Sequence, residues 1–303
     1  MTHLEIFHGL VAAGMKMRYG DKPDKEALLR CLWEKKHIMD AGFVDEYIMA
    51  FTLFRHYAAS MEIGYWPRGA VPSSIVCYCL GLTEIDPIKY GLHSVRFVND
   101  QAPKFQFDIE ASRYDEFMET AEKVLQSSAA EGYDITAIRE CMLQRLKNLT
   151  PMEYLSRKQK RPLPEDLDDE FARYALSFPD TMDLYETYLR RKNGEAWSPT
   201  GIPQLDEILA PTYGILAYQE QMLDILHKPF HTLGYKANHI RRCIQRGDTE
   251  QIAAYKAELF ADLRRATVDE AEVAWHLLTS NRRAILKSHS VSRVLAMYQY
   301  NME

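Results

Sequence analysis

The sequence has 303 residues, a hydrophobic fraction of 47% and a formal net charge of −6. This is enough apolar material for a sizeable core, and two domains suit the length better than one. No run of about 18 apolar residues occurs, and the N-terminus lacks the sections of a signal peptide, so we expect a cytoplasmic protein without a membrane span.

The charges are grouped along the chain. Basic residues concentrate in 157–161, 239–246 and 281–293, and acidic residues concentrate in 164–170 and 267–272. The negative net charge of the chain argues against a protein that coats nucleic acid indiscriminately, whereas the local basic segments are compatible with binding phosphates at a defined place. Ordinary solvated helix faces are the alternative explanation.

The cysteines do not form a metal-binding pattern. They are odd in number, lack a C-x-x-C pair, and most lie within apolar runs. We therefore expect reduced and largely buried thiols. The five residues are Cys31, Cys77, Cys79, Cys141 and Cys243.

Most of the chain has a helical pattern. Apolar spacing predicts a helix between Asp24, which can cap its start, and Gly42, which follows its end. The segment 44–61 continues as a second helix or as a strand followed by a helix. Two further helix starts are expected at Thr150, which is followed by Pro151 and Glu153, and at Thr267 with Glu270.

Strand signals are few. The segments 93–99 and 104–111 are short and rich in β-branched or aromatic residues. In the second segment, alternation places Phe105, Phe107 and Ile109 on one face of a strand and Gln106, Asp108 and Glu110 on the other. This pattern predicts one buried face and one polar face that carries two carboxylates.

The positions of these signals predict an α+β fold that is predominantly helical. We expect a mixed unit with a small sheet over residues 1–150, followed by an almost wholly helical unit over residues 151–303. Pro and Gly residues cluster at 162–164 and 194–203, on the helical side of this boundary.

Asp108 and Glu110 are the first candidate site. Mg²⁺ prefers hard oxygen ligands, and two carboxylates at i and i+2 on a strand can share two such ions during phosphoryl transfer. The D-x-[DE] spacing is common, so a solvated strand face remains the alternative.

The segment 65–82 is a candidate anion site. A Pro–Arg–Gly turn leads into an apolar helix, with Ser73 and Ser74 at its expected start. Free backbone N–H groups there could bind a phosphate, with Arg68 as a forked donor. A plain connection between a loop and a helix is the alternative.

Basic residues later in the chain form a third candidate. Arg242 and Arg246 are one turn apart on an expected helix, and Lys236 and Arg241 accompany them. Such a row could hold a triphosphate or a strand backbone, although a basic surface helix would show the same pattern. Lys287 lies near the start of another expected helix, beside His289, which we interpret as structural.

Taken together and in order, these stretches resemble the bacterial DNA polymerase III alpha subunit, the C-family replicative polymerase. Five blocks carry the resemblance, and they are much more specific in order than singly. Two stretches of this chain, "EALLRCLWEKKHIMDAGFVDEYIMAF" and "PRGAVPSSIVCYCLGLTEIDPIKYGL…RFVN", are similar to the family's palm. A third, "FDIE", lies where the family has F-D-I-D. The fourth block is a fingers segment, in which T-Y-G-x-x-x-Y-Q-E-Q followed by L-R-R-A is similar to "TYGILAYQEQ" followed by "IRRC". The fifth is a later fingers segment, in which K-S-H-x-x-x-Y-x-x-x-x-Y-Q is similar to "KSHSVSRVLAMYQ".

The resemblance implies a fold and a set of roles. It implies a palm-like domain of the nucleotidyltransferase fold that DNA polymerase beta shares, followed by a fingers-like domain. Asp108 and Glu110 would be catalytic and would hold two Mg²⁺ ions for transfer to DNA. Nucleotide binding would fall to Arg68, Gly69, Ser73, Ser74, Arg241, Arg242, Arg246 and Lys287, with DNA and deoxynucleoside triphosphate as partners.

The departures from the family are specific. The family's Gly-Arg-Gly-Ser loop is Pro67-Arg68-Gly69-Ala70 here, and its second aspartate is Glu110. The interval from about 120 to 165 lacks room for a thumb and shows no K-F-D strand, so only Asp134 could replace the third aspartate. We therefore expect a truncated palm-plus-fingers core.

Three functions remain open from the sequence. The chain could be a minimal Mg²⁺-dependent nucleotidyltransferase. It could instead be a catalytically inactive polymerase-like protein that binds DNA, a nucleotide or a replication partner. A protein from a mobile element that mimics a host polymerase would have the same sequence features as the inactive form.

Overall fold

The computed structural model of the chain describes residues 2–130, 150–152, 162–264, 266–280 and 282–299. Two compact units are formed, one by Met1–Pro162 with Val291–Glu303 and the other by Leu163–Ser290. The sequence predicts a boundary at residue 150 and places the last helix wholly in the second domain. The structure instead joins the C-terminal part of that helix to the first unit.

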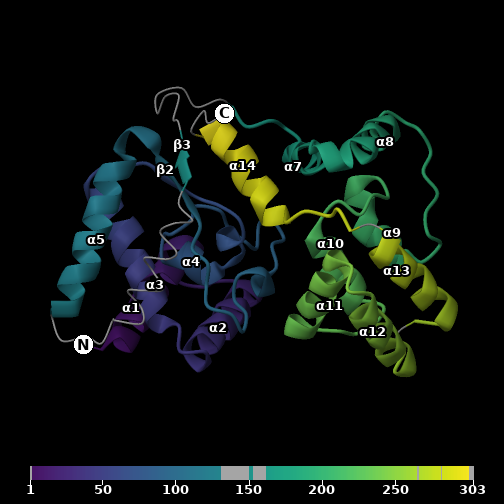
Figure 1. Cartoon of the computed structure of the whole chain (residues 1–303), viewed down its shortest axis with the longest axis horizontal. Coiled ribbons are helices and arrows are strands. Elements are labelled where there is room, and N and C mark those ends of the chain that lie inside the picture. The colour runs from purple at the N-terminus through teal and green to yellow at the C-terminus, as the bar shows by residue number, and fades with distance from the viewer. Residues whose placement is uncertain (1, 131–149, 153–161, 265, 281, 300–303) are drawn as a thin grey trace. The chain divides into compact units, whose positions relative to one another are not determined.

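The first unit combines helices with a small sheet (Figure 1). In the described residues, its α-helices are α1 (His3–Tyr19), α2 (Lys25–Asp40), α3 (Val44–Ala50), α4 (Ile75–Cys79), α5 (Tyr114–Ala130) and the part of α14 (Lys287–Gln299) from Val291 onward. A π-helical segment at Phe51–Ala58 follows α3, and short 3₁₀ turns lie at Val71–Ser73, Ser94–Arg96 and Ala111–Arg113.

The sheet has three short strands, β1 (Tyr65–Pro67), β2 (Phe107–Glu110) and β3 (Thr150–Met152), with β2 in the middle. Strand β1 pairs with β2 in antiparallel register, with Trp66 opposite Asp108, and β3 pairs with β2 in parallel. The predicted fold class, α+β and mostly helical with a small sheet, is confirmed.

The second unit is helical in the residues that the structure describes. Its elements are α7 (Leu167–Leu176), α8 (Met182–Lys192), α9 (Pro203–Leu209), α10 (Gln219–His227), α11 (Gly234–Arg246), α12 (Thr249–Ala261) and α13 (Val268–Ser280), with 3₁₀ turns at Pro179–Thr181 and Ala210–Thr212. An isolated parallel bridge joins Tyr218 to Ile285. No helix in the described part of either unit is both long and apolar enough to cross a membrane.

Local capping signals identified two helix starts correctly. The Asp24 carboxylate accepts a hydrogen bond from the Ala27 N–H at 2.7 Å at the start of α2. At the start of α13, the Thr267 hydroxyl accepts from the Glu270 N–H and the Glu270 carboxylate accepts from the Thr267 N–H. These reciprocal bonds form the predicted capping box.

Two secondary-structure predictions are wrong. The segment 93–99 is not a strand, because its N–H groups bond to nearby carbonyls in a 3₁₀ turn, with Phe97 donating to Ser94. Phe97 and Val98 are buried without a ladder, and Phe97 packs on Phe105 at 5.3 Å between ring centroids. Thr150–Met152 is a strand rather than a helix start, because pairing with β2 satisfies its backbone. Glu153 lies outside the described residues.

Aromatic residues form the core against one face of the sheet. Phe107 on β2 stacks on Phe54 of the π-helical segment at 3.9 Å, and Phe54 also stacks on Phe117 of α5 at 5.5 Å. Phe107 and Ile109 are fully buried, as the alternating pattern predicts. Helices α5 and α14 lie on opposite sides of the sheet (Figure 1).

The second unit is organised around the start of α10. The buried Gln221 side chain accepts hydrogen bonds from the Ala217 and Tyr218 N–H groups, both at 2.9 Å. Its amide nitrogen donates to the Ile208 carbonyl at 3.1 Å and to the Thr212 hydroxyl at 2.8 Å. One side chain therefore connects α9, the following turn and α10.

Gly14 allows α1 to approach α4 closely. A Cβ at this position would lie 1.9 Å from the Cys79 carbonyl oxygen, which belongs to backbone and cannot move aside easily. Gly9, on the same helix, has nothing within 4 Å of the equivalent position. Alanine substitutions at these two positions of one helix therefore separate the effect of the close contact from the effect of helix propensity.

We predict that Gly14→Ala lowers the free energy of unfolding by about 2 kcal/mol or more, because overpacking forces the helices apart. Gly9→Ala should raise it by up to about 1 kcal/mol through higher helix propensity. Denaturant unfolding followed by circular dichroism measures both. Equal effects of the two substitutions would contradict the close helix contact.

Asp169 is a buried carboxylate in the second unit. Tyr188 donates to it at 2.7 Å and the Lys192 ammonium lies 2.6 Å away. Burial by itself raises the pKa of Asp169, but the bonds from Lys192 and Tyr188 outweigh burial and lower the pKa below its usual value. The carboxylate therefore stabilises the fold in its charged form.

We predict that this contribution is present at neutral pH, where Asp169 is ionised in both states. It should be lost as the pH falls below about 4 and through the lowered pKa of the folded state. Asp169→Asn should therefore destabilise the chain at pH 7 and weaken the pH dependence of its melting temperature below pH 4. Asp168→Asn, at the exposed neighbouring position, is the control and should change both much less.

Candidate active site

Strand β2 directs Asp108 to the face of the sheet opposite the aromatic core. Its cross-strand partner on β1 is Trp66, and the two residues are 1% and 2% exposed, respectively. The Trp66 indole N–H donates to both the backbone carbonyl and the hydroxyl of Ser292 at 2.9 Å, and that hydroxyl donates to the Pro67 carbonyl. The α14 segment from Val291 onward therefore covers this face.

Two arginines neutralise Asp108. Arg293 Nη1 donates to Asp108 Oδ2 at 2.8 Å, and Arg68 Nε lies 3.5 Å from Asp108 Oδ1. Burial raises the pKa of Asp108, and the two guanidinium groups oppose this rise. Arg68, which the sequence suggests as a phosphate donor, therefore lies beside Asp108, whereas the sequence did not indicate Arg293.

Glu110 has different partners. Its carboxylate accepts from the Gly64 N–H and from the Ser112 hydroxyl, both at 3.1 Å, and it is only partly buried. These contacts hold the side chain beside the first residues of β1. The two carboxylates therefore have separate sets of partners.

As placed here, the two carboxylates do not suit a Mg²⁺ pair. Mg²⁺ usually retains several waters, whereas Asp108 is 1% exposed and already paired with cations. Across the described residues, no group of three or more His, Cys, Asp or Glu side chains could hold a metal ion. Asp134, the expected substitute for a third aspartate, lies outside the described residues.

The loop after β1 is held against the strand region before β2. The Arg68 N–H donates to the Gln106 carbonyl at 2.8 Å. Gly69 has a φ of +62°, and a Cβ there would lie 2.2 Å from the Gln106 side-chain oxygen. The positive φ favours glycine at this turn, whereas the Gln106 oxygen is the end of a flexible side chain that can move aside.

The expected anion site at Ser73 and Ser74 is filled by the chain itself. Their N–H groups donate to the Ala70 and Val71 carbonyls, so the prediction that they are free is wrong. Both residues are fully buried. A phosphate would need exposed donors at this position.

Glu34 provides the anion at this helix start. Its buried carboxylate accepts from the Ser74 hydroxyl at 2.7 Å and from the N–H groups of Ile75 and Val76 at 3.1 and 3.0 Å. Arg30, one turn earlier on α2, lies 3.4 Å from the same carboxylate and donates to the Ser73 carbonyl at 2.6 Å. This cluster joins α2 to α4.

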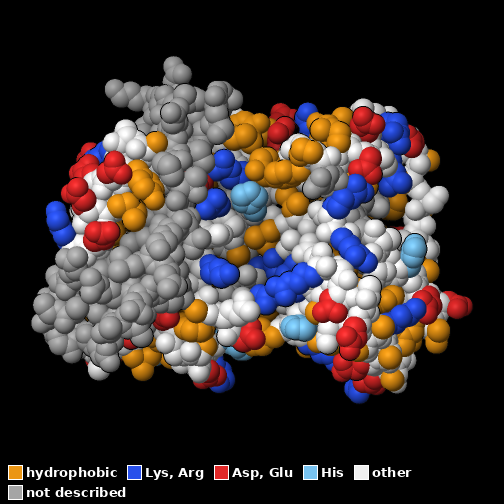
Figure 2. Space-filling model, in the orientation of Figure 1, with side chains coloured by type: hydrophobic (Ala, Val, Ile, Leu, Met, Phe, Trp, Pro, Cys, Tyr) orange, Lys and Arg blue, Asp and Glu red, His pale blue; other side chains and the backbone are white. Residues whose placement is uncertain are grey.

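The basic residues of α11 differ in exposure. Arg241 is 4% exposed and bonds to Asn238 and Gln245 of its own helix. Arg242 is partly buried and Arg246 is exposed at the last turn. On the face shown in Figure 2, acidic and basic side chains are interspersed over the second unit.

Lys287 begins α14 in the second unit. Its N–H donates to the buried Glu220 carboxylate at 2.8 Å, and its ammonium lies 5.8 Å from the centre of the Tyr218 ring. The neighbouring Gln219 side chain donates to the Ala284 carbonyl at 3.2 Å. Among the successive polar residues at 218–221, the side chains of Gln219 and Glu220 therefore form hydrogen bonds within the fold.

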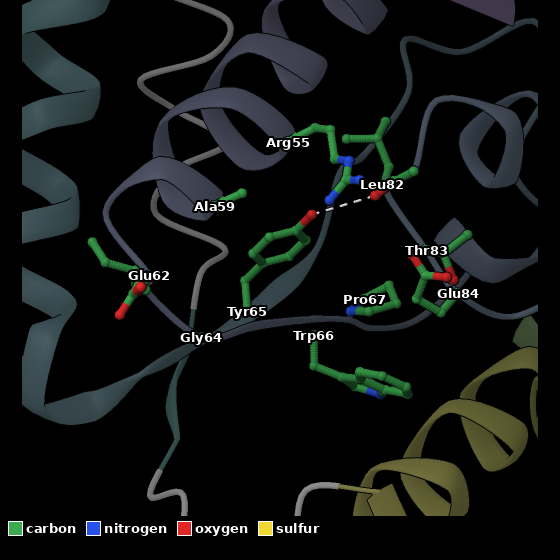
Figure 3. Close-up of a pocket in the computed structure, with 12 residues that line it drawn as sticks. Arg55, Ala59, Glu62, Gly64, Tyr65, Trp66, Pro67, Leu82, Thr83 and Glu84 are labelled. Atoms are coloured by element: carbon green, nitrogen blue, oxygen red, sulfur yellow. Dashed lines mark hydrogen bonds between the residues drawn. The ribbon is translucent and has the colours of Figure 1, made fainter. Parts of the chain in front are cut away.

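A pocket of about 550 Å³ lies beside β1 (Figure 3). Tyr65 and Trp66 point to opposite sides of the strand, and the Tyr65 hydroxyl donates to the Gly81 carbonyl at 3.3 Å. Arg55 contributes a positive charge to the lining, while Glu62 and Glu84 contribute negative charges. The mixed charges do not select an anionic ligand.

Sequence reasoning missed two residues of this site. Arg293 had a readable signal, since the K-S-H-x-x-x-Y pattern that the chain resembles has tyrosine at its position. Glu34 had none, because a carboxylate within an amphipathic helix pattern does not indicate which helix start it will reach.

Comparison with known proteins identifies the family. Residues 5–136 match the model of the bacterial DNA polymerase III alpha NTPase domain, and residues 153–267 match that of the bacterial DNA polymerase III alpha subunit finger domain. The two matches follow the same order as the two units and together span most of the chain. The chain belongs to the bacterial DNA polymerase III alpha family.

Individual relatives of this family are similar over shorter stretches. The chain is 33% identical over 122 residues to an error-prone DNA polymerase of Bdellovibrio bacteriovorus and 35% identical over 115 residues to the DNA polymerase III subunit alpha of Mycobacterium leprae. A longer match, 30% over 181 residues, is to an error-prone DNA polymerase of Cutibacterium acnes. The three matches cover 39%, 37% and 55% of this chain but only 11%, 10% and 16% of those polymerases.

The Glu34 cluster gives a stability prediction. Glu34→Ala should lower the free energy of unfolding by about 3 kcal/mol or more, because three buried donors and Arg30 lose their shared acceptor. Glu26→Ala, at an exposed position of the same helix, should cost much less. Chemical denaturation of both variants provides the measurement, and similar losses would show that the buried cluster contributes little.

Proposed function

We propose that the chain binds DNA and deoxynucleoside triphosphate with a polymerase-type scaffold, in which the first unit is palm-like and the second is fingers-like. The observation that carries this proposal is the ordered match to an NTPase-domain model and a finger-domain model of one polymerase family. Relatives named as DNA polymerases support it. The proposal places the chain in DNA replication in the cytoplasm.

Arg242 and Arg246 are the best candidates for phosphate contacts on α11. Neither guanidinium has an acidic partner within the described part of the chain, and both have some exposure. Arg241 is buried in contacts with its own helix, so its role is to support α11. Flexible or exposed cations can release counterions when they meet a phosphate backbone.

Mg²⁺-dependent nucleotidyl transfer to DNA is the second candidate. The observation that favours it is that Asp108 remains a carboxylate on the middle strand, with Arg68 nearby. Asp108 is instead bonded to Arg293, and Glu110 accepts a hydrogen bond from the Gly64 N–H. These contacts favour a polymerase-like protein that binds DNA or a replication partner without catalysis. Primer extension with Mg²⁺ or Mn²⁺ separates the two, since only catalysis requires Asp108.

We predict that the double variant Arg242→Gln/Arg246→Gln weakens binding of a fluorescent primer–template duplex. The slope of log affinity against log salt should become less steep by about 2, because two phosphate contacts are lost. Fluorescence anisotropy over a salt series measures both quantities.

Lys228→Gln is the control for this experiment. Lys228 is also a cation of the second unit, but it is already paired with Glu207 at 2.7 Å. Its substitution should change the salt slope by much less. Absence of duplex binding by the unmodified chain, or equal effects of the two sets of substitutions, would refute the proposed binding function.

A further inference from the structure

We propose that Arg293 takes the place of a divalent metal ion at Asp108, so that this acidic strand is closed to Mg²⁺ by the chain's own cation. The guanidinium donates to Asp108 Oδ2 at 2.8 Å, and Arg68 faces the other carboxylate oxygen. Metal affinity can be measured without DNA. The state of Asp108 is therefore independent of whether the chain binds DNA.

The contact is part of a packed interface. Immediately before Arg293, Ser292 is fully buried and bonds to Trp66 and Pro67 of β1. Val291 and Val294 on the same helix are also fully buried. Packing of α14 on the sheet therefore determines where the guanidinium lies, and Arg293 is not a surface side chain that meets a carboxylate by chance.

Among the residues that the structure describes, the surroundings of Asp108 offer Mg²⁺ few ligands. Asp108 is 1% exposed, so bound waters cannot complete an octahedral shell around a metal there. The Glu110 oxygens already accept from Gly64 and Ser112. A metal would have to displace Arg293, separate Glu110 from its donors and admit water at the same time.

The ion pair also has a physical reason to persist. A buried carboxylate without a partner is costly, and a guanidinium at hydrogen-bond distance compensates part of that cost. Arg293 is 22% exposed at its side chain, so its charge keeps some hydration while it bonds to Asp108. The arrangement stabilises the closed site without any bound ion.

Direct metal binding provides the test. Mn²⁺ binding is followed by the loss of the free-ion signal in electron paramagnetic resonance, using the full chain. We expect no Asp108-dependent binding in the unmodified chain. Arg293→Gln should gain Asp108-dependent Mn²⁺ binding, with an affinity at least about tenfold above any residual binding by the unmodified chain, because a unit positive charge beside the carboxylate has been removed.

Two control variants define the site. Arg293→Lys retains the charge and should stay close to the unmodified chain, whereas the Arg293→Gln/Asp108→Asn double variant should lose the gained affinity. Asp108-dependent Mn²⁺ binding by the unmodified chain would overturn the proposal. So would a folded Arg293→Gln variant without a gain in affinity.

A second measurement covers the possibility that Arg293→Gln does not fold. The melting temperature of the unmodified chain should be the same with and without Mg²⁺, because a ligand stabilises only a state that it binds. A Mg²⁺-induced rise that disappears in Asp108→Asn would overturn the proposal. Duplex binding, measured in parallel, distinguishes this result from failure of the proposed DNA-binding function.

Discussion

The ion pair between Asp108 and Arg293 is the constraint on which the first unit's polar face depends. Asp108 lies on the middle strand of the sheet, where the aromatic core occupies the opposite face. A carboxylate buried at this position requires a cation, and α14 supplies one at 2.8 Å. The same helix brings Ser292 to Trp66, so charge compensation and packing are achieved by neighbouring residues.

A second buried carboxylate follows the same principle. Glu34 fills the N-terminus of α4, where the sequence suggests a phosphate, and Arg293 faces Asp108, where the sequence suggests a metal ion. In each case a charged side chain of the chain replaces an external ion of the same sign. In this member of the polymerase III alpha family, both positions are therefore occupied by internal contacts.

The second unit uses its motif residues in a similar way. Glu220 accepts from the start of α14, and Gln221 links three successive elements through its amide. Because these groups are buried, each must find a partner within the fold. Residues that resemble a family motif therefore have structural roles that are visible only from their contacts, and exposed cations such as Arg246 are better placed to meet a ligand.

Local physical chemistry made several features predictable. Alternation over 105–110 indicated the buried and polar faces of β2, and the caps at Asp24 and Thr267 marked helix starts, because these signals depend on residues close in sequence. The order of the motifs indicated the family. At 93–99, local backbone bonds of a 3₁₀ turn together with packing of Phe97 on Phe105 replace the expected strand, and at Thr150–Met152 pairing with β2 overrides the local helix signal.

Alternation in the sequence is sufficient to assign Asp108 to the polar face of a strand, and the order of the motifs is sufficient to indicate the polymerase III alpha family. The group that covers this face is known from the folded chain alone, because Arg293 is 185 positions away from Asp108 along the sequence. Periodicity reports the direction of a side chain relative to its own strand. The identity of the group it meets depends on how distant helices pack, and here that packing places an arginine where an ion was expected.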